Sequence, residues 1–259
     1  MKSRIEEAFK KSKKEGKKAF IPYVMAGDPS LDKTRDILLL FEVCGADIVE
    51  LGVPFSDPLA DGPTIQRASE RSLKNGVTLK KVISFVKDIR QRIRIPIVLM
   101  TYFNPVFKYG IDDFIRDARN SGIDGVIVPD LPPDEAGDFI KHARKASLDT
   151  IFLLAPTSTE DRIKKVAKAS SGFIYYVSIT GITGSSLLLD GSMDLLIPKI
   201  RKYTDKPVAV GFGVSAPTEA SAVAAVSDGV IVGSAIIKKL HENPDDLKNY
   251  LISLREAIK

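Results

Sequence analysis

Short apolar runs rich in β-branched residues recur along the chain, and longer segments with helical spacing separate them. The apolar runs predict eight strands, at residues 19–26, 46–53, 96–102, 125–130, 150–155, 173–179, 207–211 and 229–232. The helical spacing predicts helices between them, such as 31–43, 111–120, 134–146, 160–169 and 218–226. The strand runs are almost continuously apolar, which is typical of parallel strands covered on both faces. The pattern therefore predicts an α/β fold, a closed (β/α)8 TIM barrel.

The series of strand–helix units runs through the chain without a Pro/Ser-rich linker or a change in composition. We therefore expect residues 1–259 to form one barrel domain, a size common for this architecture. An open, doubly wound sheet is the competing arrangement. It would favour fewer strands and a nucleotide-binding fingerprint, and Gly211 and Gly213 lack the third glycine that such a fingerprint requires.

The first 18 residues predict an additional N-terminal helix, in which lysines form a solvated face opposite Ile5, Ala8 and Phe9. These lysines account for much of the net charge of +5. Because no aromatic residues are interleaved with them, binding to nucleic acid is a weaker alternative. The segment also lacks the apolar run of a signal peptide, and no later segment is long and apolar enough for a membrane span, so we expect a cytoplasmic protein.

Composition limits the classes of reaction that the chain could catalyse. Hydrophobic residues make up 44% of the chain and charged residues 27%, a balance typical of a globular protein. The single cysteine, Cys44, lies in an apolar stretch, and the two histidines, His142 and His241, are far apart, so we expect no metal site. No predicted strand contains a lysine, which disfavours a Schiff-base aldolase. The remaining candidate is acid–base catalysis by carboxylates, with a tyrosine such as Tyr175.

The second predicted strand carries Glu50 among apolar neighbours, where burial would raise the pKa of its carboxyl group. The following loop contains three prolines together with Asp57 and Asp61. In a barrel, catalytic residues lie at the carboxyl ends of strands and in the loops that follow. Glu50 and Asp61 are therefore candidate acid–base groups, although a buried structural carboxylate and ordinary turn chemistry are the alternatives.

Glycines follow the last two predicted strands, at Gly213 and at Gly233. Helices starting at Ser215 or Ser234 would direct their positive ends at an anion, and this is the usual phosphate position in a barrel. Residues 180–186, after the sixth predicted strand, have the composition of a flexible loop that could close over a substrate. The sequence therefore favours a phosphorylated substrate.

Residues 48–63 closely resemble the signature of the tryptophan synthase alpha subunit family. Further agreement falls in family order along essentially the whole chain, at residues 22–29, Tyr102 with Asn104, 129–132, Tyr175 with Ser178, 181–184, 211–215 and 233–234. One departure follows Gly184, where many relatives have an arginine and this chain has Ser185, Ser186 and Leu187.

The resemblance implies a lyase that cleaves indole-3-glycerol phosphate to indole and D-glyceraldehyde 3-phosphate in L-tryptophan biosynthesis. Glu50 would shuttle protons, Asp61 would stabilise charge at the indole nitrogen, and Tyr175 would be the active-site tyrosine. Thr183 would contact Asp61 when the loop closes. The resemblance places the phosphate on Gly184, Gly213, Gly233 and Ser234, and the indole ring among Tyr23, Met100, Ile127, Leu153, Phe212 and Ile231.

The resemblance also implies a heterotetramer of two alpha and two beta subunits. Indole would pass to a beta subunit that holds pyridoxal phosphate, whereas this chain would have no cofactor of its own. Asp57, Tyr102, Asn104 and Pro132 would face the partner. Two other functions are possible for such a barrel. One is a phosphate-binding isomerase or epimerase, which would not need both Glu50 and Asp61, and the other is a catalytically silent barrel that activates the beta subunit.

Overall fold

The computed structural model describes residues 3–177, 191–211 and 213–259. Its strands are β1 (Ala19–Met25), β2 (Val49–Gly52), β3 (Ile97–Met100), β4 (Gly125–Ile127), β5 (Asp149–Ile151), β6 (Leu153–Leu154), β7 (Ile174–Val177), β8 (Val208–Gly211) and β9 (Gly229–Val232). Its helices are α1 (Arg4–Lys14), α2 (Leu31–Val43), α3 (Pro63–Lys74), α4 (Leu79–Ile89), α5 (Phe103–Tyr109), α6 (Ile111–Ser121), α7 (Gly137–Lys145), α8 (Glu160–Ala169), α9 (Ser192–Arg201), α10 (Pro217–Val226), α11 (Ser234–Glu242) and α12 (Leu247–Ala257), with a short 3-10 helix at Pro244–Asp246.

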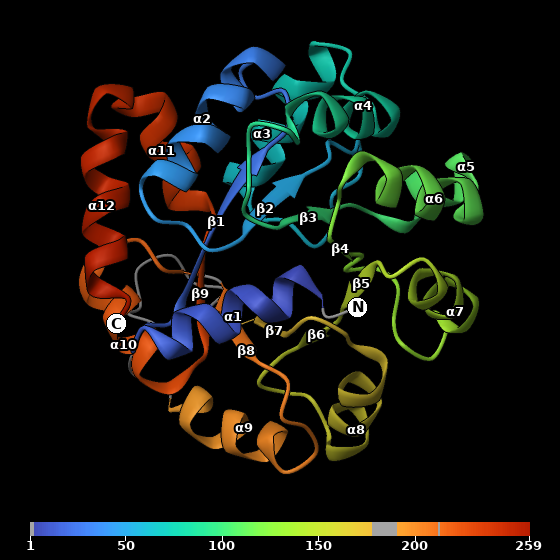
Figure 1. The fold of residues 1–259 in the computed structure, drawn as a ribbon, viewed down its shortest axis with the longest axis vertical. Coiled ribbons are helices and arrows are strands. Elements are labelled where there is room, and N and C mark those ends of the chain that lie inside the picture. Colours follow the sequence, from blue (N-terminus) through green and yellow to red (C-terminus); the bar gives the residue numbers. More distant parts are fainter. Residues whose placement is uncertain (1–2, 178–190, 212) are drawn as a thin grey trace.

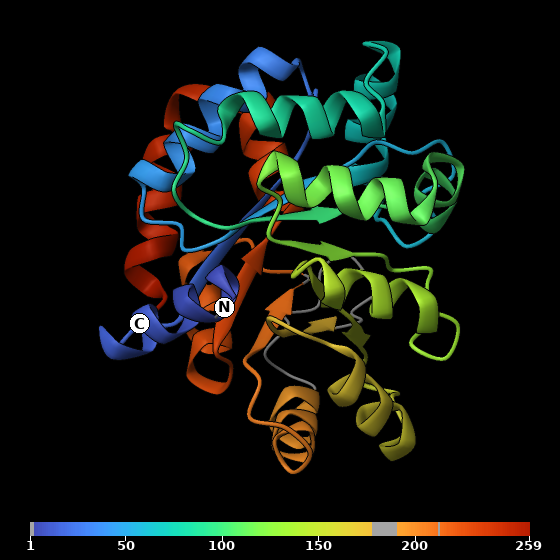
Figure 2. The same ribbon diagram turned by 45° about the vertical axis from the view of Figure 1, so that its right-hand side comes forward.

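The strands form one parallel sheet in the order β5-β4-β3-β2-β1-β9-β8-β7-β6. Its two outermost strands, β5 and β6, are consecutive in the chain and are separated only by Phe152. They are the two halves of the fifth predicted strand, so the two edges of the sheet meet there and the sheet curves into a barrel, with helices on its outside (Figures 1 and 2). The predicted (β/α)8 barrel is confirmed.

The helix predictions agree closely with the structure. The helices α2 and α8 have the predicted bounds. The helix α7 begins at Gly137, three residues later than predicted, because a turn in which Glu135 N–H donates to the Pro132 carbonyl comes first. This difference lies at the end of a helix, where hydrophobic periodicity is least informative about the exact boundary.

Two apolar layers fill the structure. The outer layer lies between the sheet and the surrounding helices, and the inner layer fills the barrel with alternate strand residues. In the inner layer, buried side chains from the strands, or from the residue directly before a strand, pack with two from α1: Ile5, Phe9, Ala19, Ile21, Ile48, Val98, Ile127, Ile151, Phe173, Tyr175, Ala209 and Ile231.

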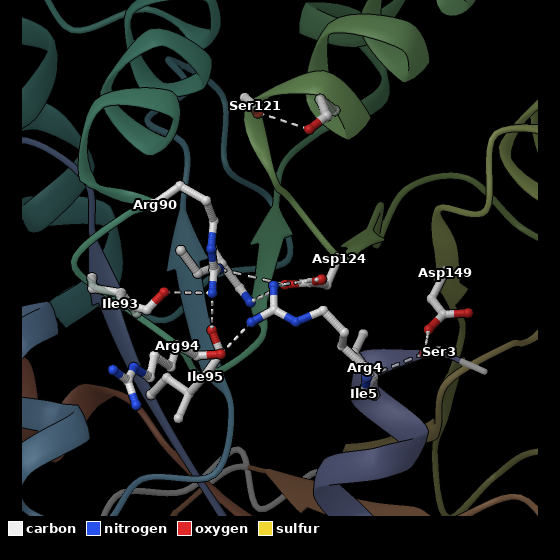
Figure 3. A network of polar contacts seen from close by, with 12 residues as sticks. Ser3, Arg4, Ile5, Arg90, Ile93, Arg94, Ile95, Ser121, Asp124 and Asp149 are labelled. Atoms are coloured by element: carbon white, nitrogen blue, oxygen red, sulfur yellow. Dashed lines mark hydrogen bonds and ion pairs between the residues drawn. The ribbon is translucent and has the colours of Figure 1, made fainter. Parts of the chain in front are cut away.

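The predicted N-terminal helix, α1, lies across the amino ends of the strands (Figure 1). The ring centroid of Phe9 is 5.6 Å from that of Phe173, the residue directly before β7. Figure 3 shows how the start of α1 is held: Arg4 forms an ion pair with Asp124 at 3.1 Å, and Ser3 donates a hydrogen bond to Asp149. Because α1 covers this end of the barrel, the carboxyl ends of the strands are left for chemistry.

Candidate active site

Glu50 lies inside the barrel on β2, level with Tyr23 on β1 and Val98 on β3. It is 2% exposed, and neither carboxylate oxygen has a hydrogen-bond partner among the residues that the structure describes. Burial, and secondarily the charge of Asp61, raises the pKa of Glu50 to about 8. Glu50 is therefore a proton donor at neutral pH, and its carboxyl group is free to meet a ligand.

Asp61 lies in the loop between β2 and α3, and hydrogen bonds hold this loop in place. The Tyr102 hydroxyl donates to Asp61 Oδ2 at 3.1 Å and accepts from the Ala60 N–H at 3.0 Å. Gln66 of α3 donates to the Asp61 carbonyl at 2.9 Å. Burial raises the pKa of Asp61 to about 6, although the hydrogen bond from Tyr102 opposes the shift. Asp61 is thus ionised at neutral pH while Glu50 is protonated, the division of roles that acid–base chemistry needs.

Two buried tyrosines, Tyr23 and Tyr175, lie close enough to this pair to feel its charge. Burial, with the charges of Glu50 and Asp61, raises the pKa of both hydroxyls well above the usual value. Both remain hydrogen-bond donors at neutral pH. A Cβ atom at Gly52 would lie 2.1 Å from the Tyr23 hydroxyl, and one at Gly211 would lie 2.3 Å from the Tyr175 hydroxyl. These glycines leave the space that the two hydroxyls occupy.

A cavity of about 300 Å³ lies at the carboxyl ends of the strands. Four of the predicted site residues line it: Met100, Ile127, Leu153 and Tyr175. The predicted residues Glu50, Tyr23 and Ile231 are buried and do not line this cavity, and neither does Asp61, although its neighbour Ala60 does. Phe212, the other predicted residue of the indole pocket, lies outside the described residues. The cavity is largely apolar and its tyrosine supplies a polar group, which suits a flat aromatic ring.

The remaining cavity lining was missed by the sequence analysis. It consists of Ala60, Pro129, Leu154, Ala155, Ser158, Arg162 and Val177. Arg162, in the first turn of α8, brings a positive charge to the cavity, and its side chain is one-third exposed. Its place in the first turn of a helix that follows a barrel strand is the one signal in the sequence that could have pointed to it.

The two helices predicted to bind an anion differ in where they start and in whether a side chain occupies the backbone N–H groups there. The helix α11 begins at Ser234, as predicted, and among the described residues no side chain caps its first N–H groups. The predicted start at Ser215 is wrong, because α10 begins at Pro217. The Glu219 carboxylate accepts from the backbone N–H groups of Ser215 and Ala216, at 2.7 and 3.0 Å, and so occupies the amides that an anion would need. An anion is therefore favoured at α11.

The other residues predicted at the phosphate are only partly described. Gly233 precedes α11, and Gly213 is exposed with a left-handed φ of 78°. Thr183 and Gly184 lie outside the described residues, as does the loop at 180–186. In the described part of the chain, no group of three or more His, Cys, Asp or Glu side chains is arranged to hold a metal ion.

Comparison with known proteins identifies the family of this chain. The family model described as tryptophan synthase alpha chain matches residues 9–259. This chain belongs to the tryptophan synthase alpha chain family. It is 50% identical to the tryptophan synthase alpha chain of Geotalea uraniireducens, over 99% of this chain and 97% of that one.

Solved structures agree with this assignment. Subunit alpha of tryptophan synthase from Legionella pneumophila is 36% identical, with a TM-score of 0.90 over 100% of this chain and 99% of that one. A chain of tryptophan synthase from Mycobacterium tuberculosis is 37% identical, with a TM-score of 0.93 over 100% and 99%. The N-terminal helix and barrel thus belong to an architecture already seen in the family.

Membership of the tryptophan synthase alpha chain family confirms the function expected from the resemblance. The chain is a lyase of tryptophan biosynthesis that cleaves indole-3-glycerol phosphate to indole and glyceraldehyde 3-phosphate. The alpha chain needs no cofactor of its own, and pyridoxal phosphate belongs to the beta subunit. None of the described helices is long and apolar enough to cross a membrane.

The four residues that the family resemblance places toward the beta subunit differ in exposure. Asp57 and Asn104 are exposed, Pro132 is half-buried, and Tyr102 is buried with 4% exposure. In the alpha chain described here, Tyr102 therefore reaches inward, to Asp61, rather than outward.

Proposed function

We propose that the cavity binds indole-3-glycerol phosphate and that Glu50, Asp61 and Tyr175 carry out its cleavage. The observation that carries this proposal is Glu50: a buried carboxyl group with a pKa of about 8, whose oxygens have no partner among the described residues, beside an aspartate with a pKa of about 6. A protonated and an ionised carboxyl group are thereby available together at neutral pH.

In the proposed reaction, Glu50 donates its proton to the indole ring carbon that carries the glycerol chain. Asp61 accepts a hydrogen bond from the indole N–H and stabilises the positive charge that develops on the nitrogen. The Glu50 carboxylate then takes the proton of the adjacent glycerol hydroxyl. The carbon–carbon bond breaks, its electron pair restores the aromatic ring, and the hydroxyl carbon becomes the aldehyde of glyceraldehyde 3-phosphate. Glu50 ends the cycle protonated.

The other predicted residues bind the substrate in this proposal. Met100, Ile127 and Leu153, which line the cavity, contact the flat indole ring, and the Tyr175 hydroxyl donates a hydrogen bond within the cavity. Tyr23, Phe212 and Ile231 are assigned to the ring by the family resemblance alone. The phosphate binds at the start of α11, through Gly233 and Ser234, with Gly213 and Gly184 nearby, and Thr183 contacts Asp61 on closure. The uncapped first turn of α11 supports this placement.

We also propose that a beta subunit docks over the carboxyl ends of the strands, giving a heterotetramer of two alpha and two beta subunits. Two large apolar side chains are exposed beside the predicted interface residues: Leu59, 94% exposed, near Asp57, and Phe107, 66% exposed, near Asn104. Exposed apolar side chains with polar neighbours are typical of a protein interface. The cytoplasmic location expected from the sequence stays a prediction.

The deciding experiment measures indole release from indole-3-glycerol phosphate by the purified chain, with and without a matched beta subunit. We expect slow release by the chain alone, faster release with the beta subunit, and loss of release in Glu50→Gln. If a folded chain that binds the beta subunit releases no indole in either condition, the silent-activator function is correct and the proposed one is wrong.

A further inference from the structure

A cluster of three side chains around the buried Asp28 joins the far ends of two helices that start at the candidate site. Asp28 follows β1, and its side chain is fully buried. Arg71 of α3 donates to both of its oxygens, from Nε to Oδ1 at 2.7 Å and from Nη2 to Oδ2 at 2.8 Å. His241 of α11 places Nε2 at 3.0 Å from Asp28 Oδ2 and at 2.9 Å from Arg71 Nη2. A bidentate pair of this kind fixes direction as well as distance.

The elements joined by this cluster carry different parts of the site. The helix α3 begins two residues after Asp61 and reaches Arg71 in its last turn. The helix α11 begins at the proposed phosphate end, Ser234, and reaches His241 in its last turn. Both helices contact β1 and each other. A helix is a rigid rod with a rise of about 1.5 Å per residue. Because the two helices also pack on β1 and on each other, holding their far ends together restricts the distance between their starts.

Both helices are attached to the loop after β1. Ser72 of α3 donates to the Ala26 carbonyl at 2.5 Å, and Asn75 donates to the Pro29 carbonyl at 2.6 Å. These bonds attach α3 to the loop independently of Asp28. The contact of His241 with Asp28 and Arg71 attaches α11 to the same place, so this histidine couples the second helix to the first.

We propose that Asp28, Arg71 and His241 are positioning residues that set the span between Asp61 and the phosphate-binding start of α11. This inference rests on the proposed function, in which one substrate reaches from Asp61 to that helix. A change of about 1 Å in such a span can cost on the order of a hundredfold in rate. The three residues act through the two helices and touch no substrate.

The kinetic test uses His241→Ala, which leaves the pair of Asp28 and Arg71 intact and so avoids a buried unpaired carboxylate. We expect kcat for indole release to fall about tenfold, whereas inorganic phosphate binds as tightly as before, because the start of α11 is unchanged. His241→Gln, which restores a hydrogen-bonding group, should recover most of kcat. The matched control is Asp32→Asn, which breaks an exposed ion pair of 2.8 Å with Arg35 and should leave kcat unchanged.

A second measurement is independent of turnover. In the parent chain, inorganic phosphate at α11 should slow hydrogen exchange of the backbone amides in the loop at 54–62, and His241→Ala should abolish this effect. If phosphate protects the loop equally in the variant, or if kcat and phosphate affinity fall together, the positioning role is wrong. If the parent releases no indole, the proposed function fails, and the exchange measurement still decides whether the cluster couples the two helices.

Discussion

Burial of Glu50 has opposite effects on catalysis and on stability. The folded chain holds its pKa at about 8, whereas the ordinary value is 4.5. Between these values the folded state keeps a proton that the unfolded state has lost, so the free energy of unfolding decreases as the pH rises from 4.5 to 8. Glu50 therefore destabilises the fold at neutral pH and contributes an acid to the active site.

We predict that Glu50→Gln is inactive and more stable than the parent above pH 5. A pKa change of one corresponds to about 1.4 kcal/mol, so the gain should approach about 3 kcal/mol at pH 7. Denaturant unfolding at pH 5, 7 and 8 measures it. The control is the exposed Glu7→Gln, which should follow the parent at each pH. Equal pH dependence in the parent and Glu50→Gln would show that Glu50 is not buried in its neutral form.

The pair of carboxyl groups also predicts a bell-shaped pH profile. Cleavage requires protonated Glu50 and ionised Asp61, so kcat/KM should fall below about pH 6 and above about pH 8. In Asp61→Asn, the residual activity should lose the acidic limb. Its alkaline limb should move to lower pH, since burial still raises the pKa of Glu50 but the charge of Asp61 no longer does. An alkaline limb that stays in place would exclude this coupling.

At the scale of elements, the strands and helices could be predicted because their apolar spacing is a local property of the chain. Glu50 could be proposed as an acid–base group for a related reason, because it lies among apolar neighbours on a predicted barrel strand, whereas Met100 and Leu153 were assigned by the family resemblance. The contact of Tyr102 with Asp61 and the place of Arg162 depend on segments that are distant in sequence. No local pattern encodes such contacts, and the family resemblance assigned Tyr102 to the partner surface only.

The helices α10 and α11 are a second example of a difference that local sequence patterns do not predict. Both follow a glycine at the end of a strand, so from the sequence alone both starts are candidate phosphate sites. Only the folded structure shows that the carboxylate of Glu219 folds back onto the amide of Ser215, whereas no described side chain caps α11. Glycine after a strand permits an anion site, but a nearby acidic residue can fill it.

This contrast predicts the effect of a charge at the start of α11. Ser234→Asp places a carboxylate where the phosphate is proposed to bind, so KM for indole-3-glycerol phosphate should rise about tenfold or more while the fold is retained. Steady-state kinetics measure the change. The matched control is Thr78→Asp, which puts the same charge at the start of α4, where the new carboxylate can take over the capping role of the Thr78 hydroxyl. A similar KM in both variants would place the phosphate elsewhere.

At the scale of the whole molecule, stability and chemistry are concentrated at opposite ends of the barrel. The amino end is covered by α1 and by the ion pairs of Arg4 and Arg90 with Asp124 (Figure 3). The carboxyl end carries Glu50, Asp61 and the exposed apolar side chains of the proposed interface. Substitutions at the two ends should therefore have separable effects.

Two phenylalanines test this separation. Phe9 in α1 is 5% exposed and packs into the inner layer, so Phe9→Ala should lower the free energy of unfolding by about 3–5 kcal/mol and leave kcat/KM of the folded chain unchanged. Phe107 is 66% exposed, so Phe107→Ala should leave stability within about 0.5 kcal/mol of the parent. Instead, it should weaken beta-subunit binding and reduce the acceleration of indole release by that subunit. Denaturant unfolding and a titration with the beta subunit measure the two effects. If Phe9→Ala impairs catalysis in the folded chain, the two ends are coupled through the inner layer, and the barrel is not the rigid support that this separation requires.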